Sequence, residues 1–376
     1  MNHKIRKIVS NFKIPGELIT IKENSQGNIN STYLLSFKVG EEIKKYLLQK
    51  INSYVFKEPH LVVKNIELVT EHINLKLQGD KKTLKFIRTN DDELIYNYVN
   101  DHGEREYYRV FEYIENCTSL DNLKESDNPE WVAYNAGKCY GAFHKYLNDF
   151  PVSFLAEIIP SFHNTPKRIN DLLKSIENGV MSRAIEGSEE IVYLLSRRKN
   201  YSMIWEELGN NIPLRVTHND TKLNNILMDS ASGVGVAVID LDTVMPGTIL
   251  FDIGDGIRSA CSNSFEDELD KEKIFINMDY TKAYLRGYLE EMLPYLTQTE
   301  IKYIGLSIAT ITYELALRFL TDYINNDVYF KIKYQKHNYD RFINQFTLLK
   351  DIENKISEIN KFVKETCKEL KNSKNE

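Results

Sequence analysis

Cysteine is scarce in this chain, which has only four: Cys117, Cys139, Cys261 and Cys367. None has the C-x-x-C spacing of a zinc site, and their scatter predicts no disulfide framework. The sequence also lacks a run of eighteen apolar residues, and its start leads into no apolar segment of signal-peptide length. We therefore expect no membrane span and a reducing, cytoplasmic compartment.

An excess of basic residues is absent as well. Lysine and arginine number 48 against 54 aspartates and glutamates, a formal charge of −6, whereas nucleic-acid binders usually show a basic patch. We therefore expect no nucleic-acid partner, although a nucleotide needs only a local cluster of cations. The apolar fraction of 42% is typical of a soluble protein, and 376 residues suffice for two lobes with separate cores.

What the chain does contain is a dense polar motif between Thr217 and Leu227 with the pattern His-x-Asp-x4-Asn. Strands are expected next at 226–228 and 236–239, joined by a glycine-containing turn, and Asp240 ends the second strand. In phosphoryl transfer of the kinase type, one Asp deprotonates a substrate hydroxyl. An Asn and a second Asp hold Mg²⁺ against the nucleotide phosphates.

Each residue of the motif therefore has an expected role. Asp220 is the candidate base at the acceptor hydroxyl, and Lys222 should lie beside the transferring phosphoryl group. Asn225 and Asp240 are the candidate Mg²⁺ ligands. We expect His218 to orient the loop, since Asp220 already fills the acid-base role. The alternative is a polar surface loop before an ordinary hairpin.

The order of strand and helix patterns predicts the fold. We expect strands at 32–38, 46–50, 83–88, 93–99 and 106–114, and helices at 61–77, 131–147, 166–179, 187–208, 275–296, 301–325 and 339–370. This order favours an α+β, two-lobed protein-kinase-like fold. An antiparallel sheet lobe (1–114) would bind the nucleotide, and a larger, mainly helical C-terminal lobe (115–376) would carry catalysis and the acceptor. Between them, Glu112, Tyr113 and Ile114 are candidate hinge contacts to the nucleotide.

A G-x-G-x-x-G loop is missing from the sequence. In its place, before the first strong strand, Gly27 permits a tight turn, while Asn28, Asn30 and Ser31 offer polar side chains to phosphate. The alternative is an ordinary polar hairpin turn. No Ala-Pro-Glu signature follows Asp240 at the distance expected of an activation segment, which disfavours a peptide substrate and favours a small molecule.

Lys50 is the candidate for the strand lysine that pairs with the α- and β-phosphates. It follows Tyr46 and Leu48 on one face of its strand, where an inward-facing residue is expected. A solvated edge lysine is the alternative. Glu67 or Glu71 on the following helix could be its carboxylate partner, and spacing does not choose between residues four apart.

These residues resemble the aminoglycoside phosphotransferase-like family of small-molecule kinases, most closely its N-acetylhexosamine 1-kinases. The resemblance covers most of 20–350 and rests on 48–52, 218–225, 238–247, 252–258 and 317–323. It implies ATP- and Mg²⁺-dependent phosphorylation of the anomeric hydroxyl of N-acetylglucosamine or N-acetylgalactosamine.

Three further assignments draw on that resemblance. Asp252 is expected to brace the catalytic loop, with a helix N-cap as the alternative. Arg318 shares a helical stripe with Glu314 and Asp322. The stripe is either a solvated salt-bridge ladder or a support that holds Arg318 at the sugar or phosphate, and the resemblance favours the second. Tyr329 is expected to stack on the pyranose ring or to be a core aromatic.

Other functions stay open on the sequence. The same chemistry could act on choline, homoserine or an aminoglycoside, and the 23 tyrosines leave room for an aromatic cage around a quaternary ammonium. A catalytically inactive kinase-like binding protein is disfavoured because Asp220, Asn225 and Asp240 are all present. The expected partners are a sugar and a nucleotide, with a monomer favoured. Neither the sugar epimer nor the choice of ATP or GTP follows from the sequence.

Overall fold

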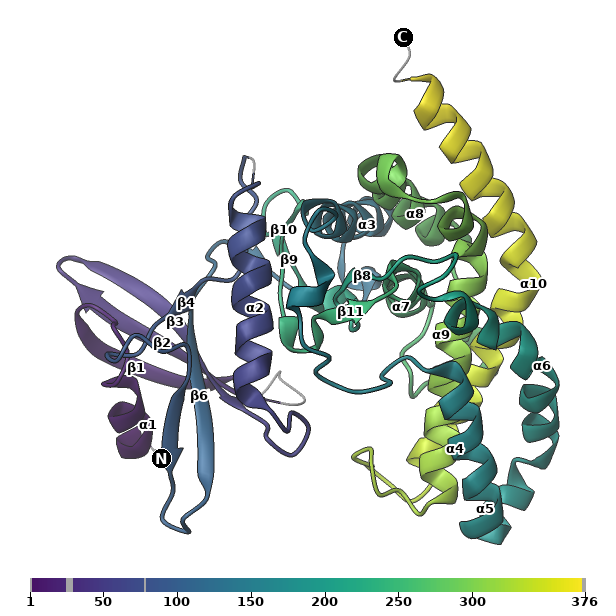
Figure 1. The fold of residues 1–376 in the computed structure, drawn as a ribbon, viewed down its shortest axis with the longest axis horizontal. Helices are drawn as coiled ribbons and strands as arrows, with labels where there is room; N and C mark the ends of the chain where they lie inside the picture. The colour runs from purple at the N-terminus through teal and green to yellow at the C-terminus, as the bar shows by residue number, and fades with distance from the viewer. Residues whose placement is uncertain (1, 25–29, 78, 374–376) are drawn as a thin grey trace.

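The computed structural model describes residues 2–24, 30–77 and 79–373. An antiparallel sheet forms one end of the molecule, and a larger helical region forms the other, with α2 (Pro59–Asn74) between them (Figure 1). The α+β architecture that we expected is therefore confirmed.

The N-terminal sheet consists of β1 (Glu17–Asn24), β2 (Ser31–Val39), β3 (Glu42–Ile51), β4 (Phe86–Ile87), β5 (Tyr96–Val99) and β6 (Arg105–Glu112). Its order is β1-β2-β3-β6-β4, with β5 also paired to β6, and every pairing is antiparallel. The turn from β2 to β3 passes through Gly40 at φ 64°, a conformation that glycine adopts without steric cost. The strand expected at 83–88 is only two residues long.

The two faces of this sheet have different apolar partners. On one face, Ile5 and Ile8 of α1 (Asn2–Val9) join Tyr46 and Leu48 of β3 in a buried cluster. On the other face, Phe111 belongs to the main core, which also contains the buried side of α2. Because both faces are covered, the parity of a strand residue decides which core it enters.

Eight α-helices build the second region of the described chain. They are α3 (Pro129–Tyr146), α4 (Thr165–Asn178), α5 (Met181–Glu186), α6 (Ser188–Glu207), α7 (Ile249–Ala260), α8 (Met278–Met292), α9 (Gln298–Ile324) and α10 (His337–Asn372). The closest helix pairs are α3 with α8, α9 with α10 and α7 with α9. The first pair needs Gly137, because a Cβ there would overlap the carbonyl oxygen of Tyr284.

The helices expected from the sequence did not include α7, and a helix in this stretch entered only through the N-cap alternative for Asp252. The buried apolar residues of α7, such as Ile253 and Ile257, face α9 in the core. In the described part of the chain, α9 alone has the length and apolar composition to cross a membrane. However, 78% of its apolar window is buried inside the molecule, as in the core helix of a globular protein.

Two small sheets hold the His-x-Asp-x4-Asn motif and Asp240. β7 (Cys117–Thr118), β9 (Ile226–Asp229) and β10 (Gly235–Val238) form one of them, and β8 (Arg215–Thr217) pairs with β11 (Met245–Gly247) in the other. The loop 218–225 runs from β8 to β9, and the loop 239–244 runs from β10 to β11. Because both ends of the two loops are paired, the loops are held side by side. The expected hairpin is confirmed.

Candidate active site

The two loops contact each other directly. The Thr243 hydroxyl donates to the His218 carbonyl at 2.6 Å, and Asn219 Nδ2 donates to the Thr243 carbonyl at 2.9 Å. Asn219 and Asp240 both have left-handed backbones, with φ of 65° and 57°. Such conformations are uncommon outside glycine and cluster at active sites, where the surrounding hydrogen bonds maintain them.

Asp220 lies between two other residues of the motif. Lys222 Nζ is 2.9 Å from its Oδ1, and Asn225 Nδ2 is 3.2 Å from its Oδ2 and donates to its carbonyl oxygen at 2.8 Å. Burial alone raises the pKa of the Asp220 carboxyl, but Lys222 and Asn225 outweigh it and hold the pKa below its usual range. The carboxylate is therefore ionised and able to accept a proton.

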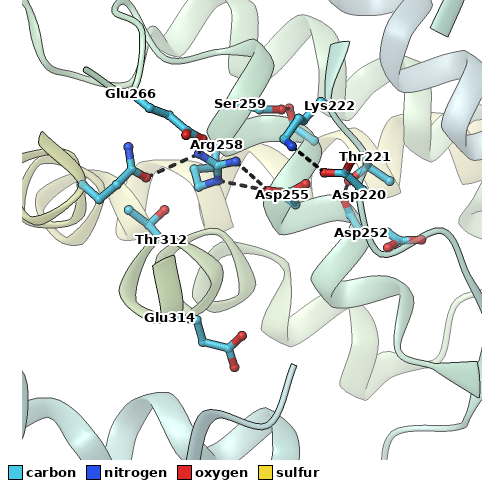
Figure 2. A network of polar contacts seen from close by, with 12 residues as sticks. Asp220, Thr221, Lys222, Asp252, Asp255, Arg258, Ser259, Glu266, Thr312 and Glu314 are labelled. Atoms are coloured by element: carbon cyan, nitrogen blue, oxygen red, sulfur yellow. Dashed lines mark hydrogen bonds and ion pairs between the residues drawn. The ribbon is translucent and has the colours of Figure 1, made fainter. Parts of the chain in front are cut away.

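Besides Asp220, the carboxylates of Asp255 and Glu266 lie near Lys222, and both are paired with Arg258 (Figure 2). There, Arg258 donates to Asp255 Oδ1 from Nε at 3.0 Å and from Nη2 at 2.8 Å, and to Glu266 Oε1 from Nη1 at 2.8 Å. Asp220, with smaller contributions from Glu266 and Asp255, raises the pKa of Lys222. The lysine therefore stays cationic, as a group that neutralises a phosphoryl oxygen must.

Asp252 supports the catalytic loop through its backbone. Its carboxylate accepts hydrogen bonds from the N–H groups of His218 at 2.6 Å and Asn219 at 2.8 Å, and from His144 Nε2 at 2.8 Å. All of these groups are buried. Their bracing geometry matches the role expected of Asp252, whereas the N-cap alternative is wrong because Thr248 caps α7.

His218 orients the loop from inside the core. Its ring is fully buried, and Nε2 donates to the Ile239 carbonyl at 2.8 Å. Nδ1 accepts from the backbone N–H of Asp220 at 3.2 Å. With both ring nitrogens engaged by the backbone, this histidine has the positioning geometry that we expected.

Asn225 and Asp240 provide a donor set that fits Mg²⁺. Burial, followed by the nearby carboxylates of Asp242 and Asp220, raises the pKa of Asp240 to about 7. Such crowding of carboxylates favours a bound cation. Within the described ranges, no three His, Cys, Asp or Glu side chains are arranged for a metal. A Mg²⁺ held between one or two carboxylates and nucleotide phosphates needs no such group.

The candidate phosphate-binding turn is only partly described. Gly27 and Asn28 lie outside the described residues. Asn30 is buried and engaged, since its Nδ2 donates to Asp242 Oδ2 at 2.6 Å and its Oδ1 accepts from the Asn52 backbone at 2.9 Å. Ser31 begins β2. The structure thus brings this end of the turn to the loop that carries Asp240.

The hinge candidates lie at the end of β6 and directly after it. Glu112 is its last residue and forms an ion pair with Lys85 at 2.7 Å, while the Tyr113 backbone donates to the Lys45 carbonyl at 3.2 Å. Ile114 is next along the chain. The following strand, β7, already pairs with β9, so the chain passes from one sheet to the other here.

Lys50 does not reach this cluster. It shares the α1 face of the sheet with Tyr46 and Leu48, and its Nζ lies 2.8 Å from Glu106 Oε1. The expected pairing with a carboxylate on α2 is therefore wrong. Glu67 instead binds Lys64 at 2.8 Å and Arg88, and Glu71 makes no contact with Lys50 among the described interactions.

Arg318 and Tyr329 come together at a cavity of about 590 Å³ in the helical region. It lies between α4, α9 and the segment after α9, and its lining includes Ile159, Phe162, Arg168, Asp171, Lys174, Asn178, Arg318, Thr321, Asp322, Asn325, Tyr329 and Phe330. The guanidinium carbon of Arg318 is 5.3–5.8 Å from the ring centres of Phe162, Tyr329 and Phe330. Asp220 lies outside the lining.

The charged stripe on α9 is not the solvated ladder that we considered. Glu314 is buried and accepts from Thr165 Oγ1 and, at 3.1 Å, from His163 Nδ1. Asp322 is also buried, and its carboxylate accepts from the backbone N–H groups of 328–330 at 2.8–3.0 Å. These hydrogen bonds position Tyr329, which is 65% exposed. The core-aromatic alternative for Tyr329 is therefore wrong too.

The cavity has an excess of positive charge. Arg168, Lys174 and Arg318 line it, and burial, with Arg318 nearby, lowers the pKa of Arg168. Its two carboxylates are already engaged, Asp322 by the backbone and Asp171 by Lys167 at 2.8 Å. Arg168 has only a long ion pair with Asp171, at 3.9 Å, and no carboxylate pairs with Lys174 or Arg318 among the described residues. A ligand there would therefore meet a net positive charge.

Sequence reasoning missed three residues of these sites. Arg168 carried no signal, because lysines and arginines are common on exposed helix faces. His144 was a polar residue in the apolar pattern of α3. Arg109, which forms an ion pair with Asp242 beside Asp240, interrupts the aromatic and apolar run Tyr107–Phe111 in β6. A charge inside such a run could have marked Arg109 as functional.

The fold occurs in several solved kinases. A microcompartment-associated aminopropanol kinase matches with a TM-score of 0.59 and 13% identity over 96% of this chain and 99% of its own. A spectinomycin phosphotransferase bound to ADP and spectinomycin matches with a TM-score of 0.61 and 11% identity, over 94% of this chain and 98% of its own. Choline kinase from Cryptosporidium parvum matches with a TM-score of 0.57 and 16% identity, over 95% of this chain and 97% of its own.

At these identities the structural matches establish the fold alone. The model of the phosphotransferase enzyme family, however, matches residues 20–293, which is more than half of the sequence. The family part of the resemblance is thus confirmed, and the narrower likeness to N-acetylhexosamine 1-kinases stays a prediction. The chain belongs to the phosphotransferase enzyme family and is a small-molecule phosphotransferase.

Proposed function

We propose that this protein transfers the γ-phosphoryl group of ATP, with Mg²⁺, to the anomeric hydroxyl of an N-acetylhexosamine. The observation that carries the reaction type is the cluster of Asp220, Lys222, Asn225 and Asp240 on two paired loops. The sugar itself rests on the sequence resemblance and on the charge of the cavity.

The donor side of the proposal follows from the fold. Residues 1–114 would form the nucleotide-binding lobe and 115–376 the catalytic and acceptor lobe, with Glu112, Tyr113 and Ile114 at the adenine. A related spectinomycin phosphotransferase has been solved with ADP, which supports a nucleoside triphosphate donor here. We expect a cytoplasmic monomer.

In this mechanism the chain supplies positioning and charge. Asp220 accepts the proton of the attacking hydroxyl, and Lys222 neutralises an oxygen of the transferred group. Asn225 and Asp240 would hold Mg²⁺, which stabilises negative charge on the phosphates when bound. Asp252 and His218 fix the loop, so that little reorganisation accompanies the reaction.

The charge of the cavity favours a neutral acceptor over a cationic one. Choline and aminoglycosides are cations, and they would meet Arg168, Lys174 and Arg318. A cavity of about 590 Å³ lies within the size range of ligand pockets, roughly 300–1,000 Å³, and is ample for one sugar. Tyr329 could stack on the pyranose ring, while Arg318 hydrogen-bonds its oxygens.

The wall of the cavity packs against the helix that holds the catalytic loop. His163, which follows Phe162 of the lining, contacts the ring of Phe251 on α7 at 5.3 Å between centres. The next residue of α7, Asp252, holds the catalytic loop. This packing fixes the cavity wall relative to the loop, and a sugar in the cavity would have to extend beyond its lining to reach Asp220.

A panel of acceptors with ATP and Mg²⁺ tests the proposal. N-acetylglucosamine and N-acetylgalactosamine should give the highest kcat/KM, with glucose and galactose slower because partners of the acetamido group are then unsatisfied. Arg318→Ala should raise the sugar KM without changing the ATP KM, unlike the matched change of exposed Lys364 to Ala on α10. Preference for choline, homoserine or an aminoglycoside would refute the sugar assignment. ATP binding without transfer to any acceptor would indicate an inactive binding protein.

A further inference from the structure

A buried arginine of β6 reaches the loop that carries Asp240. Arg109 is only 1% exposed, and its Nε and Nη2 donate to Gln49 Oε1 at 3.0 and 2.8 Å. Its Nη1 lies 2.5 Å from Asp242 Oδ1. One side chain therefore connects β3, β6 and the loop of the proposed metal ligand.

Strand parity places Arg109 and Lys50 on opposite faces of the sheet. Gln49 pairs with Arg109 across β3 and β6, and Lys50 pairs with Tyr108. Because neighbouring residues of a strand point to opposite faces, Gln49 and Arg109 face Asp242 while Lys50 faces α1. On this side of the sheet β3 presents an amide, and the cation comes from β6.

Arg109 lies where the Asp240 loop meets the end of the candidate phosphate-binding turn. The arginine lies close enough to Asp240 to offset part of the repulsion among the carboxylates there. Its partner Asp242 also accepts from Asn30, at the end of the candidate phosphate-binding turn. Arg109 Nη1 and Asp242 Oδ1 form a buried ion pair at 2.5 Å, and Nη1 has no hydrogen-bond partner among the described residues. Because Nη1 carries two N–H groups, at least one of them is left for a further oxygen.

We propose that Arg109, held by Gln49 and Asp242, is the cation of the N-terminal lobe that contacts the α- and β-phosphates of the donor. Arg109 would take the place of the strand lysine that contacts these phosphates in other kinases. Asp242 would replace the helix glutamate as its counter-charge. The inference rests on the proposed function only in requiring a nucleotide donor, and it is independent of the acceptor.

Nucleotide titrations of the full chain with Mg²⁺, followed by calorimetry, test this role. Adenosine, ADP and a non-hydrolysable ATP analogue are compared. Arg109→Gln should weaken ADP and the analogue by about tenfold or more, because a charge-assisted hydrogen bond is lost, and leave adenosine affinity unchanged. Arg105→Gln is the matched control, since Arg105 lies exposed on the same strand. It should change none of the three affinities.

A second variant and the melting temperature separate binding from folding. Arg109→Lys keeps the charge but loses the planar fork, so it should retain part of the preference for ADP over adenosine. If Arg109→Gln weakened the affinities for adenosine and ADP equally and lowered the melting temperature, Arg109 would have only a structural role and the proposal would be overturned. The proposal would also be overturned if Lys50→Gln, rather than Arg109→Gln, lost the preference for ADP over adenosine. Wild-type protein that binds no nucleotide would overturn this inference and the proposed function together, whereas a different acceptor would overturn only the latter.

Discussion

The backbone N–H of His218 donates to the Asp252 carboxylate at 2.6 Å, so the first turn of a buried helix directly holds the catalytic loop. This bond joins elements that are far apart in sequence. It makes the position of the candidate base depend on the packing of α7 against the core.

Asp252→Asn should therefore loosen the loop. The amide keeps the shape but turns a donor toward one backbone N–H, and leaving a buried group unsatisfied costs about 1–3 kcal/mol. We expect a lower melting temperature and a reduced kcat, with the KM for ATP nearly kept. Asp270→Asn, at an exposed ion pair with Lys273, is the matched control. A variant with wild-type stability and kcat would refute this bracing role.

Asp220→Asn should reduce kcat by roughly 10²–10⁴-fold, the usual contribution of a general base. The change removes a proton acceptor, but neither a phosphate contact nor a proposed metal ligand. Nucleotide affinity measured by titration should therefore stay close to that of the wild type. Near-normal turnover would mean that another residue is the base.

Asp240→Ala should lower activity and metal-dependent nucleotide affinity together, because it removes one of two proposed Mg²⁺ ligands. Titration of ATP with and without Mg²⁺ measures the effect. The gain in affinity that Mg²⁺ gives the wild type should shrink in the variant, while adenosine binding is retained. An unchanged Mg²⁺ dependence would place the metal elsewhere.

The Glu106 cluster predicts a pH dependence of stability in the N-terminal lobe. Burial alone would raise the pKa of this carboxyl, but hydrogen bonds from Lys4, Lys50 and Tyr108 lower it from 4.5 to about 2. Stability from a depressed pKa is fully present above the unfolded value, and it is lost as pH falls from about 5 toward 2.

Glu106→Gln should consequently destabilise the protein by about 2 kcal/mol at pH 7, since its lysine partners are partly exposed and the full shift is not realised. The difference in free energy of unfolding between the variant and the wild type should become smaller as the pH falls from 5 to 3. Urea unfolding at several pH values provides the measurement. A difference that stays constant over this range would show that Glu106 does not titrate as described.

The clustering of the candidate catalytic residues was predictable because its geometry is local. Asp220, Lys222 and Asn225 lie within six residues of one another, and Asp240 follows a hairpin whose turn is evident in the sequence. Local spacing of this kind survives any error in the surrounding tertiary structure. The same reasoning found β9, β10 and most of the helices.

The nucleotide side was less predictable because it depends on which face of a strand meets which core. Lys50 follows Tyr46 and Leu48 in an alternating pattern, and β3 contributes a buried residue to a core on each face, Leu48 on one and Ile51 on the other. Alternation therefore identified a strand without saying which side faces the metal loop. The Arg109–Asp242 contact joins residues 133 positions apart, and no local pattern encodes it.

The cavity that we propose for the acceptor shows the same limit. Arg318 was visible on its helix, but its neighbours Phe162 and Arg168 come from a distant part of the chain. The helix α7 was missed because Asp252, Asp255 and nearby glycines resemble turn residues. They form a helix because the apolar residues between them are buried against α9.

Phosphorus NMR of the product tests the central claim most directly. With ATP, Mg²⁺ and an N-acetylhexosamine, the account predicts a sugar 1-phosphate. It also predicts that the 1-O-methyl glycoside will not react, since that glycoside lacks the hydroxyl that Asp220 deprotonates. A sugar 6-phosphate, or efficient phosphorylation of the methyl glycoside, would contradict the account.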